Sequence, residues 1–142
     1  MIIKQLSVFI ENTAGRVCEV MGVLADANIN VSALSIADGS DFGIMRLIVK
    51  DHEEAYKLLK DAGFTVKKTP VICCKVPDTP GGLRRILTYL AQENISIDYM
   101  YAFSIGQDAS IMIRTEDPEK TIEVLSKNNL EVMCSRDLYQ AD

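Results

Sequence analysis

Apolar residues in the first half of the chain recur with two different periods. In 6–10, Leu6, Val8 and Ile10 alternate with Ser7 and Phe9, which is typical of a strand, whereas in 17–24 the apolar residues follow the i, i+3, i+4, i+7 spacing of an amphipathic helix. The pattern predicts a strand at 6–10, a helix at 17–24, strands at 31–37 and 45–49, a helix between Asp51 and Gly63, and a strand at 64–68. We expect Asp51 to cap the start of the second helix and Gly63 to follow its end.

The second half of the chain repeats the first at a constant offset of 66 residues, without a gap. The aligned identities between Ser7 and Val66 are Thr13 with Thr79, Gly15 with Gly81, Leu24-Ala25 with Leu90-Ala91, Asn28-Ile29 with Asn94-Ile95, Asp51 with Asp117, Glu53 with Glu119, Leu59 with Leu125 and Val66 with Val132. Such a repeat indicates two copies of one structural unit rather than one larger domain.

The elements predicted in the second half follow the same order. They are a strand at 71–76, a turn at 78–82, a helix with apolar residues at 83, 86, 87 and 90, strands at 97–103 and around 111–113, a helix at 119–128 and a last strand at 132–138. Within 97–103, the side chains of Tyr99, Tyr101 and Phe103 recur at period two and are expected to share one face.

Each half therefore has the element order βαββαβ, which is the ferredoxin-like arrangement. We predict an α+β fold with two tandem units, 1–68 and 69–142, each an antiparallel sheet with both helices on one face. The link at 67–70 is too short for independent domains, so the halves should lie side by side or share a sheet. A unit of this size is marginally stable alone, and we also expect a homodimer.

Composition narrows the classes of function. The chain has 15 Lys and Arg against 20 Asp and Glu, a net charge of −5, and no basic tract, which argues against a nucleic-acid partner. Doublets such as Arg84-Arg85 are isolated and fit a solvated surface. No apolar run is long enough to span a membrane and no signal peptide is visible, so we expect a cytoplasmic protein without membrane contact.

Two short motifs, each present twice, resemble those of the ACT domain family. The first motif is Asn12-Thr13-Ala14-Gly15-Arg16-Val17, with Asp78-Thr79-Pro80-Gly81-Gly82-Leu83 as its second copy. The other is Ala27-Asn28-Ile29-Asn30-Val31, with Glu93-Asn94-Ile95-Ser96-Ile97 as its second copy. The resemblance covers nearly the whole chain and implies a module that binds an amino acid and regulates a metabolic enzyme or transcription.

The resemblance also implies which residues contact the amino acid. They are Asn12, Ala14, Gly15 and Asn30 in the first half, and Asp78, Pro80, Gly81, Gly82 and Ser96 in the second. ACT domains usually accompany a catalytic or DNA-binding domain. This chain has none, so we expect a stand-alone tandem member.

The chemistry of the turn supports this assignment independently. The first turn of a helix carries unpaired N–H groups and a partial positive charge, so it holds a carboxylate well. Gly15 and Gly81 let a ligand approach the backbone, and the amides of Asn12 and Asn30 can bind either end of an amino acid. Asp78 is anionic where the first half has a neutral amide, so the two sites are expected to differ.

A purely structural role for the same residues is the alternative. Asn12 or Thr13 would then cap the first helix, and Asp78 or Thr79 would cap its counterpart in the second half. Asx residues and glycine are common in caps and turns generally, so the turn by itself does not separate the two interpretations.

Other reactive residues give no pattern of catalysis or of a cofactor. His52 is the single histidine, and Cys73 and Cys74 are adjacent, so their side chains should face opposite sides of a strand. Cys134 on the last predicted strand is expected near them, but nothing else indicates a redox or metal role. We expect reduced thiols, no metal, no cofactor and no catalytic residues.

The sequence thus predicts an amino-acid-binding regulatory protein that is not an enzyme. One alternative is a regulatory subunit acting in trans on a biosynthetic enzyme such as acetolactate synthase, with the enzyme as its partner. A less favoured alternative is a small enzyme on a ferredoxin-like scaffold. The sequence does not name the amino acid.

Overall fold

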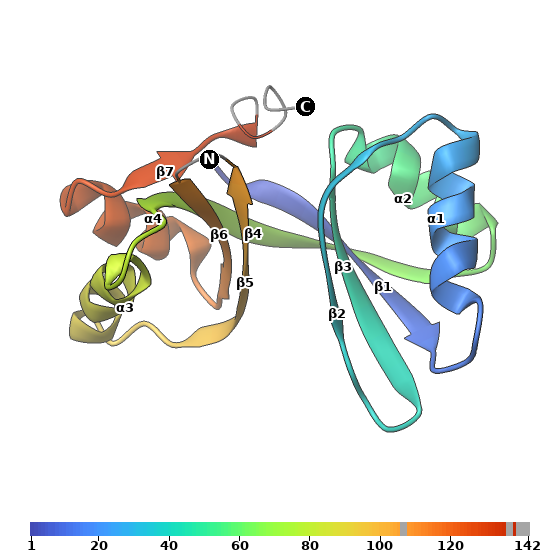
Figure 1. The fold of residues 1–142 in the computed structure, drawn as a ribbon, viewed down its shortest axis with the longest axis horizontal. Coiled ribbons are helices and arrows are strands. Elements are labelled where there is room, and N and C mark those ends of the chain that lie inside the picture. Colours follow the sequence, from blue (N-terminus) through green and yellow to red (C-terminus); the bar gives the residue numbers. More distant parts are fainter. Residues whose placement is uncertain (106–107, 136–137, 139–142) are drawn as a thin grey trace. The chain divides into compact units, whose positions relative to one another are not determined.

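The computed structural model describes residues 1–105, 108–135 and 138 (Figure 1). The chain divides into two compact units. One comprises residues 4–69, and the other comprises residues 1–3 together with the described residues from Pro70 onward. We refer to them as the first and the second unit.

The first unit has the order βαββαβ. Its elements are β1 (Ile3–Glu11), α1 (Arg16–Asp26), β2 (Val31–Ala37), β3 (Phe42–Val49), α2 (His52–Asp61) and the beginning of β4 (Thr65–Pro77). The strand order is β2-β3-β1-β4, so β2 forms one edge of the sheet. The antiparallel register places Leu47 of β3 opposite Leu6 of β1 and Leu34 of β2.

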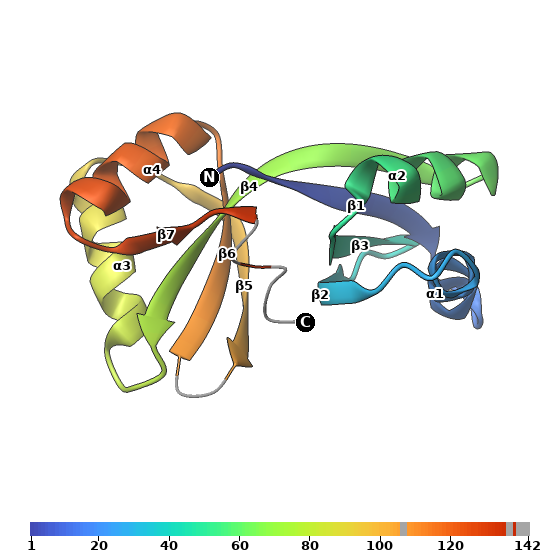
Figure 2. The same cartoon turned by 90° about the horizontal axis from the view of Figure 1, so that it is seen from above.

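The second unit repeats this order. After the remainder of β4 come α3 (Gly82–Gln92), β5 (Ile97–Ile105), β6 (Asp108–Thr115), α4 (Pro118–Lys127) and β7 (Glu131–Met133). The strand order is β5-β6-β4, with β7 paired to the other side of β4, and α3 and α4 cover one side of these strands (Figure 2). Both units therefore have the predicted ferredoxin-like arrangement.

Each unit has its own apolar core between the helices and one face of the sheet. In the first unit the core includes Leu6 and Leu47 from the strands, Leu24 from α1 and Leu59 from α2, each fully buried. The repeat places Ile72, Ile113, Leu90 and Leu125 in the corresponding positions of the second core. Full burial of one such side chain stabilises the fold by about 1.5–3 kcal/mol.

The helix ends are formed by short-range contacts that recur in both units. The carboxylates of Asp51 and Asp117 accept hydrogen bonds from the N–H groups of Glu54 and Lys120, each at 3.1 Å, and so cap α2 and α4. The residues that follow the four helices have positive φ: Asn28 (59°), Gly63 (95°), Asn94 (56°) and Asn129 (60°). Asn and Gly adopt this left-handed conformation at low cost, which explains the repeated Asn-Ile pairs after α1 and α3.

Two predicted elements differ from the structure. The expected linker at 67–70 lies inside β4, which runs without interruption from Thr65 to Pro77. The last strand was expected at 132–138, but β7 ends at Met133, and Ser135 and Leu138 are helical. Positions 136–137 of that expected strand lie outside the described residues, as do 139–142 of the expected second domain.

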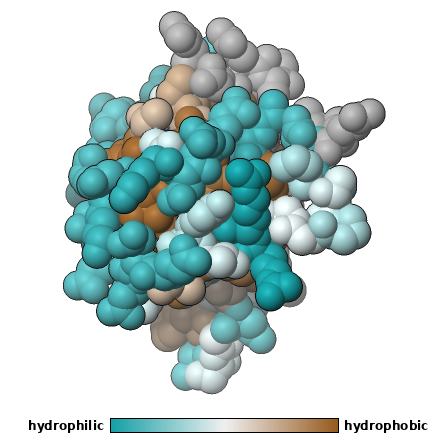
Figure 3. All heavy atoms as spheres, turned by 90° about the vertical axis from the view of Figure 1, so that its left-hand side faces the viewer, coloured by the Kyte–Doolittle hydropathy of each residue, from teal (hydrophilic) through white to brown (hydrophobic). Residues whose placement is uncertain are grey.

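The surfaces of the helices match their amphipathic pattern. The side of the molecule shown in Figure 3 is mainly hydrophilic, with apolar atoms visible in the gaps. In the part of the chain that the structure describes, no helix has the length and apolar character needed to cross a membrane.

Candidate functional site

The turns before α1 and α3 have the same backbone geometry. Gly15 (φ 90°) and Gly81 (φ 86°) precede the two helices in the left-handed conformation, and no side chain caps either helix among the described residues. In the first turn the Glu19 N–H bonds to the Gly15 carbonyl at 2.9 Å, and in the second the Arg85 N–H bonds to the Gly81 carbonyl at 3.1 Å. The capping role considered for Asn12, Thr13, Asp78 or Thr79 is therefore wrong.

Asn12 instead ties its turn to the hairpin between β2 and β3. Its Nδ2 donates to the Gly39 carbonyl at 2.6 Å, and its backbone N–H donates to the Asp41 carbonyl at 3.2 Å. Because a carbonyl oxygen only accepts hydrogen bonds, the amide is oriented with Nδ2 toward Gly39. The Oδ1 atom of Asn12 is the acceptor that this side chain can offer to a ligand.

Asp78 has the matching position in the second unit, and its contacts differ. Its Oδ2 accepts a hydrogen bond from the Ser104 hydroxyl at 3.3 Å, and the residue is exposed. Both units thus place an oxygen acceptor at this position, neutral in Asn12 and anionic in Asp78. An α-ammonium group is the part of an amino acid that such oxygens bind best.

The two glycines of the second turn are required for different reasons. Gly81 needs its positive φ, whereas a Cβ on Gly82 would lie 2.5 Å from the Pro77 carbonyl oxygen, closer than real Cβ atoms approach. Pro80, Gly81 and Gly82 also line a cavity of about 410 Å³ at the start of α3. The turn of the second unit is therefore open to a small molecule.

Asn30 and Ser96 lie at the other ends of the same helices. Asn30 lines a cavity of about 430 Å³ between α1 and β2, whose walls include the apolar side chains of Met21, Ile29 and Leu34. Ser96 lines a cavity of about 500 Å³ beyond the end of α3. The carboxyl-bearing residues Asp98, Glu116 and Asp117 and the single cation Lys120 belong to that cavity.

The predicted contact residues do not form one group within either unit. Asn12, Ala14 and Gly15 precede α1, whereas Asn30 follows it, and the eleven residues of α1 span about 16 Å. The same separation divides Pro80, Gly81 and Gly82 from Ser96, because α3 also has eleven residues. A free amino acid is shorter than this distance and contacts only one end of a helix at a time.

Sequence reasoning missed the charged residues around the α3 turn. Arg85 and Lys75 line the cavity of about 410 Å³ together with Glu131 from the start of β7. Arg85 belongs to the Arg84-Arg85 doublet that fits a solvated surface by sequence alone. Glu131 is distant in sequence, and only the folded unit brings it to this cavity.

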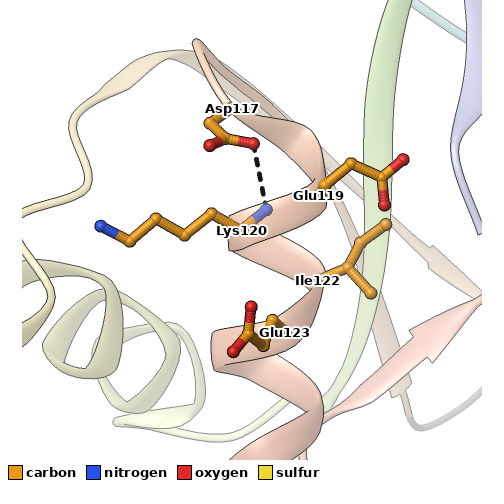
Figure 4. Close-up of a pocket in the computed structure, with 5 residues that line it drawn as sticks. All are labelled: Asp117, Glu119, Lys120, Ile122 and Glu123. Atoms are coloured by element: carbon orange, nitrogen blue, oxygen red, sulfur yellow. Dashed lines mark hydrogen bonds between the residues drawn. The ribbon is translucent and has the colours of Figure 1, made fainter.

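A larger hollow lies on the outside of α4, and none of the predicted contact residues lines it. It measures about 670 Å³ and is lined by Asp117, Glu119, Lys120, Ile122 and Glu123. Figure 4 shows the Asp117 carboxylate accepting the Lys120 backbone hydrogen bond, so this carboxylate is used as the α4 cap. The exposed side chains of Glu119, Lys120 and Glu123 fit the solvated face of a helix, and Ile122 packs partly against the core.

The cysteines of β4 lie on opposite faces of the sheet, as predicted. Cys74 belongs to the core, while Cys73 has its Sγ 3.7 Å from the Met133 Sδ. Burial raises the pKa of Cys73 to about 12 and that of Cys74 to about 11, so both stay protonated and weakly nucleophilic. Across the described residues, no three His, Cys, Asp or Glu side chains gather as metal ligands.

His52 and Glu53 form a surface network with Lys68. The Lys68 Nζ lies 2.6 Å from the Glu53 carboxylate and the His52 Nε2 lies 3.4 Å from it. The hydrogen bond from Lys68 lowers the pKa of the Glu53 carboxyl. These groups are ordinary surface ion pairs and do not surround a cavity described above.

Comparison with known proteins identifies the family. A family model described as an ACT domain pair matches residues 1–141. The solved structure of protein BT0572 from Bacteroides thetaiotaomicron is 46% identical, covers 98% of this chain and 96% of that chain, and superposes with a TM-score of 0.94. A search of curated proteins gave no match.

Two more distant solved structures share the fold. The ligand-free regulatory subunit of aspartate kinase from Thermus thermophilus is 16% identical over 89% of this chain and 93% of its own, with a TM-score of 0.67. The regulatory subunit of aspartate kinase from Thermus flavus is 17% identical over 97% of this chain and 91% of its own, with a TM-score of 0.63. The match of the family model along the chain, together with the doubled βαββαβ order, shows that the chain belongs to the family of ACT domain pairs.

Proposed function

We propose that this chain is a regulatory protein that binds a free amino acid through the turns preceding α1 and α3 and has no catalytic activity of its own. The observation that carries the proposal is the doubled turn, with a left-handed glycine and no side-chain cap before each helix. Such a helix start offers backbone N–H groups and a partial positive charge to a carboxylate. Membership of the ACT family supports an amino acid as the source of that carboxylate.

The hydrogen-bond acceptor beside each turn suits the α-ammonium group of an amino acid. The Asn12 Oδ1 and the Asp78 carboxylate can accept hydrogen bonds from an α-ammonium group while the carboxylate occupies the helix start. In this arrangement the two charges of an amino acid meet two groups of opposite character. A ligand with a carboxylate alone would leave the acceptor without a donor.

The separation of Asn12 from Asn30 favours a site completed by another ACT unit. Since about 16 Å of helix divides them, one ligand touches both kinds of residue only where the turn of one unit meets the β2 start of another. A second copy of the chain can supply that unit. Leu34 and Ile36 on the edge strand β2 are 46% and 48% exposed and would give a homodimer an apolar contact.

Regulation would follow if the ligand binds one arrangement of the units more tightly than another. The names of the two Thermus structures make a trans-acting subunit of an amino-acid-metabolising kinase the second candidate. In that case an endogenous copy of the chain should co-purify with a larger enzyme whose activity responds to the same amino acid.

Equilibrium dialysis against the twenty amino acids tests the proposal. The purified chain should retain one amino acid, or one chemical class, and Asn12→Ala and Asn30→Ala should weaken its retention. Asn128→Ala is the matched control, because the Asn128 Nδ2 donates to the Val124 carbonyl of its own helix at 2.8 Å. Retention in both test variants equal to that of the wild type would contradict the assignment of the site.

A further inference from the structure

The cavity at the start of α3 is lined by parts of the second unit that are far apart in sequence. Its walls include Lys75 of β4, the turn residues Gly81 and Gly82, Arg85 of α3 and Glu131 of β7. Its volume of about 410 Å³ falls within the range of small-molecule sites. It therefore has room for a free amino acid.

In the first unit, side chains of the chain itself occupy the corresponding space. There Arg16 occupies the position of Gly82, and its guanidinium lies 4.6 Å from the centre of the Phe64 ring. Its Nη1 atom lies 2.5 Å from the Glu19 carboxylate. A pair of opposite charges from the chain itself thus occupies this part of the first unit.

The second unit lacks each of the side chains that occupy this space in the first unit. Gly82 has no side chain, Leu130 replaces the aromatic ring of Phe64, and Arg85 stands where the first unit has Glu19. Gly82 also tolerates no side chain, since its Cβ would lie 2.5 Å from the Pro77 carbonyl oxygen. The chain leaves open in one unit the space that it fills in the other.

The charges around the open space fit a zwitterion. The Lys75 Nζ lies 3.3 Å from the Asp108 Oδ2, so the Asp108 carboxylate already balances the charge of Lys75. Arg85 and Glu131 then remain as one cation and one anion on the wall of the same cavity. An α-amino acid carries the complementary pair of charges a few ångströms apart.

We propose that the second unit binds its amino acid in this cavity, with the α-carboxylate on Arg85 and the α-ammonium on Glu131. This inference rests on the proposed amino-acid function. In the second unit it assigns the α-ammonium to Glu131 instead of Asp78 and adds Arg85 to the helix start as a partner of the α-carboxylate, two residues that the family resemblance does not supply. The Arg16–Glu19 pair excludes the same mode of binding from the first unit. The two units are therefore not equivalent as binding sites.

Titration calorimetry on the full chain tests the proposal, using whichever of the twenty amino acids the wild type retains in dialysis. Arg85→Gln and Glu131→Gln should each weaken binding about tenfold or more, or abolish one bound molecule per chain, because each removes a charge-assisted hydrogen bond. Arg84→Gln is the matched control, since Arg84 is the neighbouring exposed arginine and does not line this cavity. Its affinity and stoichiometry should equal those of the wild type.

Two derivatives of the retained amino acid separate the roles of the two residues. The N-acetyl derivative lacks the ammonium, so its affinity should be the same for the wild type and for Glu131→Gln. The carboxamide derivative lacks the carboxylate, so its affinity should be the same for the wild type and for Arg85→Gln. Wild-type affinity and stoichiometry in both Arg85→Gln and Glu131→Gln would overturn the inference while leaving the proposed function intact. If the wild type retains none of the twenty amino acids, the proposed function fails first and this inference fails with it.

Discussion

The side chain of Asn12 donates a hydrogen bond to the carbonyl of Gly39 at 2.6 Å and so joins the turn before α1 to the hairpin between β2 and β3. The bond joins two segments that are distant in sequence, and it leaves only the Oδ1 of Asn12 to serve as an acceptor. A residue that the family resemblance assigns to ligand contact thus also has a structural role.

Loss of this bond should have a measurable effect on stability. Asn12→Ala removes an exposed hydrogen bond, and we expect the free energy of unfolding to fall by about 0.5–1.5 kcal/mol. Asn12→Asp should be no better, because a carboxylate cannot donate to the Gly39 carbonyl. Urea unfolding measures both changes. Unfolding midpoints equal to that of the wild type in both variants would show that the bond does not contribute to the stability of the fold.

The glycines offer a second test, because two of them sit in opposite environments. Gly82→Ala places a Cβ 2.5 Å from the Pro77 carbonyl oxygen and should lower the free energy of unfolding by more than about 1 kcal/mol. Gly22→Ala lies inside α1 with nothing within 4 Å of its Cβ and should raise it by about 0.4–1 kcal/mol. Thermal unfolding of the two variants should shift in opposite directions, and a shift in the same direction would contradict this account.

The aspartates that cap α2 and α4 should stabilise the fold by similar amounts. Asp51→Ala and Asp117→Ala each remove an acceptor 3.1 Å from a backbone N–H and should cost about 0.5–2 kcal/mol. Asp61→Ala is the control, because Asp61 is the last residue of α2, where a negative charge opposes the helix dipole. Chemical denaturation should show a loss for the first two variants and none for the third.

The four cysteines should differ in reactivity in the native protein. With a pKa of about 12, Cys73 has a thiolate fraction at pH 8 about a thousandfold below that of a thiol with the ordinary pKa of 9.0, and burial also blocks access. Cys18 is exposed and should react first with iodoacetamide. Peptide mapping should find Cys73 and Cys74 modified only after denaturation, and rapid native alkylation of either would refute their burial.

The sequence predicted the doubled βαββαβ order because periodicity and capping are local properties. The limits of β2, at 31–37, agree with its apolar pattern, and the roles of Asp51 and Gly63 follow from their position next to an amphipathic segment. The sequence predicts a short linker at 67–70, between the two halves of the repeat. Tertiary contacts make it a strand, including the bond from Arg114 to the Pro70 carbonyl at 2.8 Å and the hydroxyl pair of Ser7 and Thr69 at 3.0 Å.

The site could be predicted only in part. The family motifs indicated both helix ends, but a motif carries no distance, and the length of α1 separates Asn12 from Asn30. The cavity beside Gly82 could not be predicted, since it depends on Arg85 and Glu131 meeting after α3, α4 and β7 have packed. Comparing Arg16 with Gly82 across the repeat is the signal in the sequence that hints at the open space.

Amino-acid binding itself is tested most directly by the melting temperature of the purified chain against each of the twenty amino acids at millimolar concentration. Protein concentration must be constant, because the melting temperature of a dimer depends on it. A ligand at about a hundredfold its Kd stabilises the native state by about 2.7 kcal/mol, which shifts the melting temperature by several degrees. We expect one amino acid, or one chemical class, to produce such a shift, whereas an unchanged melting temperature with all twenty would contradict the proposed function.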